Sequence, residues 1–292
     1  MKKRLGDRRD GKKIRNLDGM HYIMVDLKPN RCDADVYINQ KIDVTNLIKY
    51  IEKNKKENPE SKITYFHAFS MAISKLFYNY PYLNRFVCNR TFYERNDVIL
   101  AFVAKIAFQD DSDEVMINIK INEKDNIFDL SKKIKNRVDK IRKSKINKKE
   151  NTNNIVDKVG KLPKLFRVPL VGFLKWLDKH GWLPSFIIKD NLYYSSIILS
   201  NLGNLGIGSI YHNLTNFGTS SMLATIGQIH KEVIVDKNGK EKVIDVCDFG
   251  INCDERIADG YYFAKAIKTF EYIINNPELL EDSADKKIEI NE

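Results

Sequence analysis

The chain has 292 residues, of which 43% are hydrophobic and 30% are charged. This balance argues against both a disordered chain and a membrane-embedded one, and the length allows one large domain or two small ones. The 49 Lys and Arg residues outnumber the 39 Asp and Glu residues, and the net charge of +10 favours phosphate-bearing partners such as coenzymes, nucleotides, nucleic acid or anionic lipid.

Residues 1–20 are expected to form a basic arm that lies on the surface or against a partner subunit. No apolar run follows Met1, so we expect no secretory signal peptide and a cytoplasmic protein. The longest apolar region, 162–188, is interrupted by basic residues and two prolines and cannot serve as a transmembrane segment. The four cysteines lack CxxC or zinc-ligand spacing, so we expect reduced thiols and no metal.

Hydrophobic periodicity predicts the helices and strands of the rest of the chain. In order they are a strand around Val36 and Ile38, helices capped by Asp43 and Thr64, strands at 98–108 and 115–121, a helix from Ile127, a polar loop at 144–154, an amphipathic helix within 162–188, strands at 195–199 and 221–226, a hairpin joining 232–235 to 242–246, and a helix from Gly260 that ends before Pro277. Helices and strands mix without strict alternation, which predicts one α/β sandwich domain at 21–282, with a helical insertion at about 160–190 and an acidic tail at 283–292.

A polar cluster at 253–260 stands between a buried strand and a helix, where catalytic groups are commonly displayed. The structural alternative is that Asp254 and Glu255 are solvated turn carboxylates and that Asp259 is a helix cap. Among the histidines, only His212, in a polar loop after a glycine-rich turn, has a suggestive setting; the others are expected in packed or turn positions. The sequence contains no phosphate-binding loop, dinucleotide fingerprint, nucleophile elbow or zinc motif.

Four stretches, in the same order and spacing, resemble the chloramphenicol acetyltransferase and dihydrolipoamide acyltransferase catalytic-domain family. They are Lys41-Ile42-Asp43-Val44-Thr45, 64–84 with its ending Pro81-Tyr82-Leu83-Asn84, Ser200-Asn201-Leu202-Gly203, and 254–260 followed by Asn276-Pro277-Glu278-Leu279-Leu280. The resemblance implies a two-layer sandwich with a mixed sheet and helices on one face, a homotrimer, and active sites between subunits. It also implies a small-molecule acyl donor and acceptor, with coenzyme A as co-substrate.

The family's motif His-x-x-x-Asp-Gly supplies its general base, and here Glu255 occupies the histidine position while Asp259 and Gly260 are retained. A glutamate is a weaker base than a histidine by roughly two pKa units, or about 3 kcal/mol, unless burial raises its pKa. By approximate register, His212 falls near the family's oxyanion-stabilising Ser or Thr. It would then donate to the oxyanion or pair with Glu255 across the interface, or else be a polar rim residue.

Other site residues are expected to hold the active-site loops in place. In the family, the aspartate corresponding to Asp259 pairs with an arginine, for which the candidates are Arg15 and Arg31. Gly260, Arg256, Asn201 and Gly203 are expected to be structural at the site, and the coenzyme-binding residues are not identified.

Three functions are compatible with the sequence. The first is a freestanding coenzyme-A-dependent acyltransferase without a lipoyl domain, in which Glu255, with or without His212, replaces the usual base. The second is a catalytically silent homologue that serves as a trimeric binding or scaffold protein. The third is a nucleic-acid or membrane-surface binder that uses the basic face at 132–149; because aromatic residues are not interleaved there, no nucleic-acid partner is expected.

Overall fold

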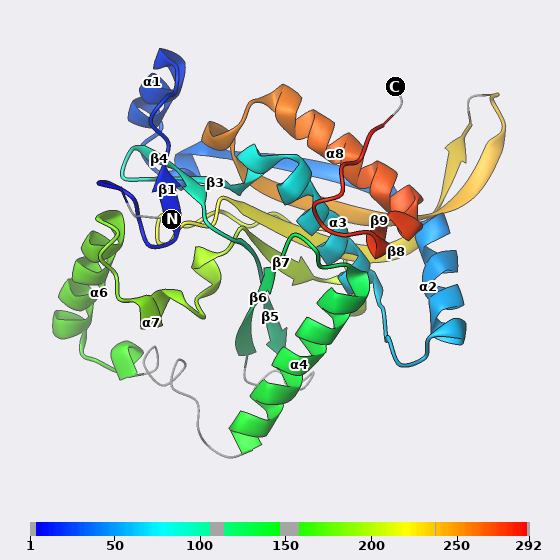
Figure 1. The fold of residues 1–292 in the computed structure, drawn as a ribbon, viewed down its shortest axis with the longest axis horizontal. Helices are drawn as coiled ribbons and strands as arrows, with labels where there is room; N and C mark the ends of the chain where they lie inside the picture. Colours follow the sequence, from blue (N-terminus) through cyan, green and yellow to red (C-terminus); the bar gives the residue numbers. More distant parts are fainter. Residues whose placement is uncertain (1–3, 106–113, 147–157, 237, 291–292) are drawn as a thin grey trace.

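The computed structural model describes residues 4–105, 114–146, 158–236 and 238–290 (Figure 1). The strands are β1 (Gly11–Lys13), β2 (Asp35–Asp43), β3 (Arg85–Cys88), β4 (Thr91–Arg95), β5 (Val98–Lys105), β6 (Glu114–Ile121), β7 (Ile197–Asn201), β8 (Met222–Val235) and β9 (Glu241–Asp254). The α-helices are α1 (Gly19–Leu27), α2 (Thr45–Glu57), α3 (Tyr65–Asn79), α4 (Ile127–Ile146), α6 (Lys164–Lys179), α7 (Ser185–Ile188) and α8 (Gly260–Asn275).

A mixed sheet in the order β2-β9-β8-β7-β5-β6 forms the centre of the molecule. The strand β7 is parallel to both of its neighbours, β5 and β8, and the other adjacent pairs are antiparallel. A smaller antiparallel sheet, β1-β4-β3, lies near the N-terminus. The predicted strands are therefore confirmed over the described residues, while the predicted continuation of the first long strand to 108 and most of the predicted loop at 144–154 lie outside them.

One face of the large sheet packs against α2, α3, α4 and α8, as the mixed-sheet sandwich prediction requires. The helix α3 is the central element of this layer, since ten of its consecutive residues, 68–77, are buried. It begins after Thr64, as predicted. The strand residues alternate accordingly, with Leu100 and Ile119 directed into the core. The expected fold is confirmed.

An extended segment, 207–217, crosses the opposite face of the sheet. Thr225 holds this segment through both backbone groups of Ile210. The Oγ1 of Thr225 donates to the Ile210 carbonyl at 2.8 Å and accepts from the Ile210 amide at 3.2 Å. Farther along, the Tyr37 hydroxyl donates to Oδ1 of Asn213 at 2.8 Å. These contacts place His212 over β9 and β2.

Two terminal segments are more ordered than their composition suggests. Within the predicted arm, β1 pairs with β4, and Gly11 lies so close to Phe86 that an added Cβ would be 2.7 Å from its ring. Residues 283–290, the described part of the acidic tail predicted at 283–292, pack on the domain. Ala284 is fully buried, and the Ser283 carbonyl accepts from Nζ of Lys75 at 2.7 Å. Backbone pairing and these contacts are invisible to a composition-based prediction.

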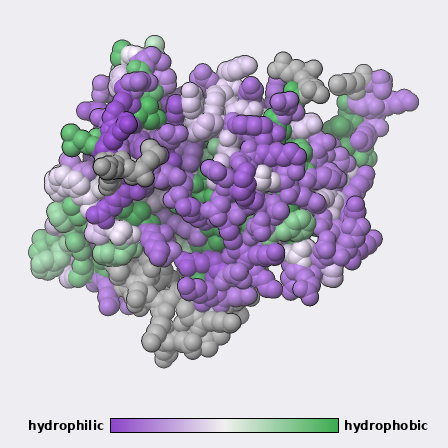
Figure 2. Space-filling model, in the orientation of Figure 1, coloured by the Kyte–Doolittle hydropathy of each residue, from purple (hydrophilic) through white to green (hydrophobic). Residues whose placement is uncertain are grey.

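The predicted insertion contains α6 and α7, at the edge of the molecule away from the helical layer (Figure 1). The space-filling view shows apolar residues gathered on the surface at the same place (Figure 2). No helix within the described ranges is long and apolar enough to span a membrane.

Candidate active site

The β9-to-α8 junction is held by a buried ion pair. Asp254, the last residue of β9, is fully buried and accepts from Nε and Nη2 of Arg256, both at 2.7 Å. A guanidinium fork on one carboxylate is a strong and directional interaction. Nε of Arg31 lies 3.8 Å from the same carboxylate. The junction therefore has a fixed backbone on which the neighbouring side chains are displayed.

Glu255 stands between these two buried residues and is directed elsewhere. Its carboxylate forms an ion pair with Nζ of Lys28, the residue that follows α1, and the two side chains are 31% and 39% exposed. The Lys28 carbonyl in turn accepts from Nη1 of Arg256 at 2.8 Å. In the single chain, Glu255 is thus neither desolvated nor unpartnered.

Asp259 caps α8 by accepting from the amide of Tyr262 at 2.7 Å. The predicted pairing of Asp259 with Arg15 or Arg31 does not occur within the described residues, which is a correction. Nη2 of Arg15 lies 3.5 Å from Oδ1 of Asp7, and Arg31 forms an ion pair with Asp254. The buried carboxylate of this junction is Asp254, because it ends a core strand, whereas Asp259 begins a helix at the surface.

His212 is exposed, and its amide donates to Oδ1 of Asn252 at 3.3 Å. Within the described part of the chain, its ring makes no hydrogen bond or ion pair with Glu255 or with any other residue. The neighbouring Tyr211 ring packs edge-on against Tyr37 at a centroid distance of 5.0 Å. The structure therefore keeps His212 on the open face of the sheet but does not form the predicted pair within one chain.

Asp35 is a candidate that the sequence analysis missed. It is the first residue of β2 and lies opposite Asp254 in the β2–β9 register. Burial and the neighbouring Asp254 carboxylate raise its pKa to about 6, although the Leu214 amide, which donates to its Oδ2 at 3.2 Å, opposes the shift. A carboxyl group with this pKa exchanges protons near neutral pH. Its environment depends on strand register, which the sequence does not reveal.

The turn after β7 adjoins a large cleft. Oδ1 of Asn201 accepts from the Gly203 amide at 3.2 Å, and a Cβ at Gly203 would be 2.9 Å from the Gly227 carbonyl. The cleft, of about 940 Å³, lies between this turn and the α2–α3 connection, and Lys55 and Lys62 line it. The cleft has room for an elongated ligand, and the ammonium groups of these two lysines can pair with phosphate groups.

A family model matches residues 27–157 and 188–281, which together exceed half of the chain. Its description is 2-oxoacid dehydrogenases acyltransferase (catalytic domain). The chain belongs to this acyltransferase family. The family resemblance inferred from the four motifs is therefore confirmed. The search of curated proteins found no match.

Solved structures share the fold of this acyltransferase domain at low sequence identity. The probable dihydrolipoamide acetyltransferase of Listeria monocytogenes is 16% identical, with a TM-score of 0.57 over 91% of this chain and 95% of that one. The dihydrolipoamide acetyltransferase of Azotobacter vinelandii is 12% identical, with a TM-score of 0.55 over 92% and 94% of the two chains. A chloramphenicol acetyltransferase is 11% identical, with a TM-score of 0.54 over 90% and 99%. These likenesses establish the fold.

In this acyltransferase chain, the cleft lies beside the middle of β9, whereas Glu255 follows the C-terminal end of that strand. Cys247 lines the cleft, and Asp254 ends the strand seven residues later, a span of about 23 Å at about 3.3 Å per residue. A single chain therefore does not bring the cleft and Glu255 into one pocket.

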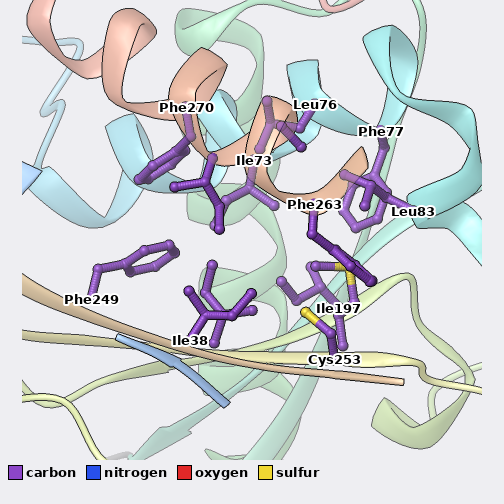
Figure 3. A pocket seen from close by; sticks show the side chains of 14 residues that line it. Ile38, Ile73, Leu76, Phe77, Leu83, Ile197, Phe249, Cys253, Phe263 and Phe270 are labelled. Carbon is purple, nitrogen blue, oxygen red and sulfur yellow. The ribbon is translucent and has the colours of Figure 1, made fainter. Parts of the chain in front are cut away.

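A second cavity, inside the acyltransferase core, is not a substrate site. It lies between α3, α8 and the sheet, has a volume of about 30 Å³, and is lined by apolar side chains such as Phe249, Phe263 and Phe270 (Figure 3). A cavity of this size and polarity has room for about one water and no polar partner for it. Within the described ranges, no group of three His, Cys, Asp or Glu side chains could hold a metal ion.

Proposed function

We propose that this protein transfers an acyl group between coenzyme A and a small acceptor and works as a homotrimer with active sites between subunits. The observation that carries the proposal is the Asp254–Arg256 fork. It fixes the junction so that Glu255 stands at the position where the family resemblance expects the general base. In the Azotobacter vinelandii enzyme, the catalytic roles of a serine, a histidine and an asparagine four positions after the histidine were investigated. Glu255 and Asp259 have the same spacing.

In the proposed reaction, the Glu255 carboxylate takes the proton of an acceptor thiol, hydroxyl or amine as that group attacks the thioester carbonyl carbon. The tetrahedral intermediate then expels the coenzyme thiolate by cleavage of the carbon–sulfur bond, and Glu255 returns the proton to sulfur. Glu255 must first leave Lys28. Because both side chains are about one-third exposed, their ion pair is worth no more than about 1 kcal/mol, which permits the exchange.

The cleft beside Asn201 and Gly203 is the proposed coenzyme site. Lys55 and Lys62 would pair with the phosphates, and the Asn201 turn would border the pantetheine arm. Since the cleft and Glu255 are separated along β9 in one chain, the acyl group in one cleft would meet Glu255 of the partner subunit. His212, on the open face of the sheet, is proposed to donate to the oxyanion or to pair with that glutamate.

The Lys28–Glu255 ion pair favours a second candidate, a catalytically silent trimer that retains the fold as a binding or scaffold protein. A carboxylate held by an ammonium group is a poorer proton acceptor than an unpaired one. Acyl-CoA binding without turnover would be its signature.

The test combines calorimetry of acetyl-CoA binding with release of free coenzyme thiol, using dihydrolipoamide and chloramphenicol as acceptors. Under the acyltransferase proposal, Glu255→Gln lowers kcat at least 100-fold, and Glu255→His preserves or raises it. Lys28→Met raises the rate by freeing the base. Glu232→Gln, which removes the carboxylate of another exposed pair, with Lys41, is the matched control and leaves the rate unchanged.

Three further outcomes test the details of the proposal. If His212→Ala is as damaging as Glu255→Gln, the paired base is supported over Glu255 alone. Binding of acetyl-CoA with no thiol release from wild type, together with activity created by Glu255→His, would select the silent protein. Sedimentation that gives a stable monomer would contradict the shared site.

A further inference from the structure

The segment 158–187 falls between the two ranges that match the family model, so the family's catalytic domain does not require it. It contains α6 and most of α7. Both tryptophans of the chain, Trp176 and Trp182, are in this insertion. An added segment with such a concentration of aromatic residues needs an explanation other than the acyltransferase fold.

The helix α6 has two apolar sides. At 100° per residue, Leu170, Leu174 and Leu177 share the side that is partly buried against the domain. The adjoining side is exposed, and the apolar face that it forms continues beyond the helix to Trp182 and Phe186. Figure 2 shows apolar residues gathered on this part of the surface. The exposed residues of this face, with their exposed fractions, are Leu165 (78%), Phe166 (63%), Phe173 (55%), Trp176 (46%), Trp182 (57%) and Phe186 (64%).

The apolar face is held rigidly in its exposed position. Asp178, in the last turn of α6, is 2% exposed and accepts from the Tyr194 hydroxyl at 2.7 Å and the Gly218 amide at 2.9 Å. Nη2 of Arg8 lies 3.1 Å from the same carboxylate. The rings of Trp176 and Trp182 also pack edge to face, with 5.4 Å between their centroids. The aromatic side chains are thus presented outward from a fixed base.

Positive charge surrounds this face. The insertion has six basic residues, Lys158, Lys161, Lys164, Arg167, Lys175 and Lys179, against one acidic residue, Asp178. Because Asp178 is buried and paired with Arg8, it neutralises none of the exposed lysines. Lys164, Lys175 and Lys179 share one side of α6, next to the apolar face.

We propose that the insertion binds the surface of an anionic lipid bilayer, with α6 lying in the plane of the interface. Its exposed Leu, Phe and Trp side chains would enter the boundary between headgroups and acyl chains, and its lysines would contact lipid phosphates. With 16 residues, among them five that are charged, α6 is suited to lie on a bilayer and not to cross it. A second copy that docks by the same face is a less suitable cover, because the two faces would oppose six basic residues to six.

Intrinsic tryptophan fluorescence tests this proposal directly, because both tryptophans report from the insertion. Vesicles of phosphatidylglycerol and phosphatidylcholine are expected to shift the emission of the full chain to the blue and to sediment with it, whereas vesicles of phosphatidylcholine alone bind at least tenfold more weakly. Added salt should weaken the binding. No shift and no co-sedimentation with phosphatidylglycerol vesicles at low salt would overturn the proposal.

Variants separate the lipid surface from other covers. Leu165→Ser/Phe166→Ser/Phe173→Ser and, separately, Lys164→Glu/Lys175→Glu are each expected to weaken vesicle binding at least tenfold. The control Val233→Ser/Val235→Ser/Val243→Ser changes equally exposed residues of the β8–β9 hairpin and should bind as wild type does. Equal binding by all variants overturns the proposal. So does a wild-type emission that is blue without lipid and shifts to the red on dilution, since a second copy then covers the face.

Discussion

Arg8, in the N-terminal segment, and Asp178, at the end of α6, form a buried ion pair with 3.1 Å between Nη2 and Oδ1. Nη1 of Arg8 also donates to the Asp178 carbonyl at 2.6 Å. Their side chains are 3% and 2% exposed. This pair links the start of the chain to an insertion 170 residues later, and Tyr194 and Gly218 complete the carboxylate's hydrogen bonds.

Replacement of Arg8 should therefore be costly. Arg8→Met leaves the Asp178 carboxylate buried without its cation, and we expect the free energy of unfolding to fall by about 3–5 kcal/mol. Urea denaturation measures the loss. Arg90→Met is the matched control, because its pair with Asp26, at 3.5 Å, is exposed on both sides and should be worth less than about 1 kcal/mol. Equal effects of the two substitutions would show that the Arg8 pair is not buried in solution.

The sequence could predict the helices and strands of the main domain, but not the pairing of the N-terminal segment that contains Arg8. The helices and strands of the main domain have clear periodicity, and Thr64, for example, marks a helix start that the structure confirms. The strand β1 has only three residues, Gly-Lys-Lys, and no alternation. It forms because β4 offers backbone partners 80 to 84 residues away, which is a tertiary effect that no local pattern records.

For the candidate site, the sequence likewise predicted some of the residues but not their partners. The motif predicted Glu255, Arg256 and Asp259 at one strand-to-helix junction, where they are found. Their partners were not predictable, since Lys28 is 227 residues from Glu255 and contacts it through the packing of α1 against the junction. The choice between Asp254 and Asp259 as the buried acid likewise depends on which of them ends the core strand.

Asp259 as a helix cap gives a prediction opposite to that of a buried ion pair. Asn is also a good cap, so Asp259→Asn should change the free energy of unfolding by less than about 0.5 kcal/mol, while Asp259→Ala should lower it by about 1 kcal/mol. Thermal or urea unfolding of both variants decides the matter. A loss of 3 kcal/mol or more in Asp259→Asn would mean that an arginine pairs with it in the assembled protein.

His67 should make the protein less stable in mild acid. Burial lowers its pKa from 6.5 to about 4, and its Nδ1 lies 3.2 Å from the Thr64 amide in the capping box of α3. Because the folded state disfavours the charged ring, its stabilising contribution is present above pH 6.5 and is lost as the pH falls towards 4, by up to about 3 kcal/mol. His67→Gln preserves the cap and should remove this dependence. The exposed His212→Gln is the control in urea denaturation at each pH, and it should retain the wild-type slope.

Asp35 predicts a pH dependence of the opposite sign in an overlapping range. Its pKa is raised from 3.8 to about 6, mainly by burial, so the folded state prefers the neutral acid and stability decreases as the pH rises from about 4 to about 6. Asp35→Asn remains neutral and can still accept from the Leu214 amide. The variant should match wild type at pH 4 and exceed it at pH 7, by no more than about 1 kcal/mol because solvent screens the partly exposed carboxylate.

Urea denaturation of Asp35→Asn at pH 4, 5, 6 and 7 measures this difference, with the exposed Asp26→Asn as the control. The comparison at pH 7 is decisive, since there wild type must keep a charged carboxylate beside that of Asp254. If the variant were less stable than wild type at pH 7, the attraction of the Asp35 carboxylate to Arg31 and Arg256 would exceed the cost of its burial. Asp35 would then belong to the ion-pair network that holds Glu255 in place, and its role as a proton-exchanging group near the site would have to be abandoned.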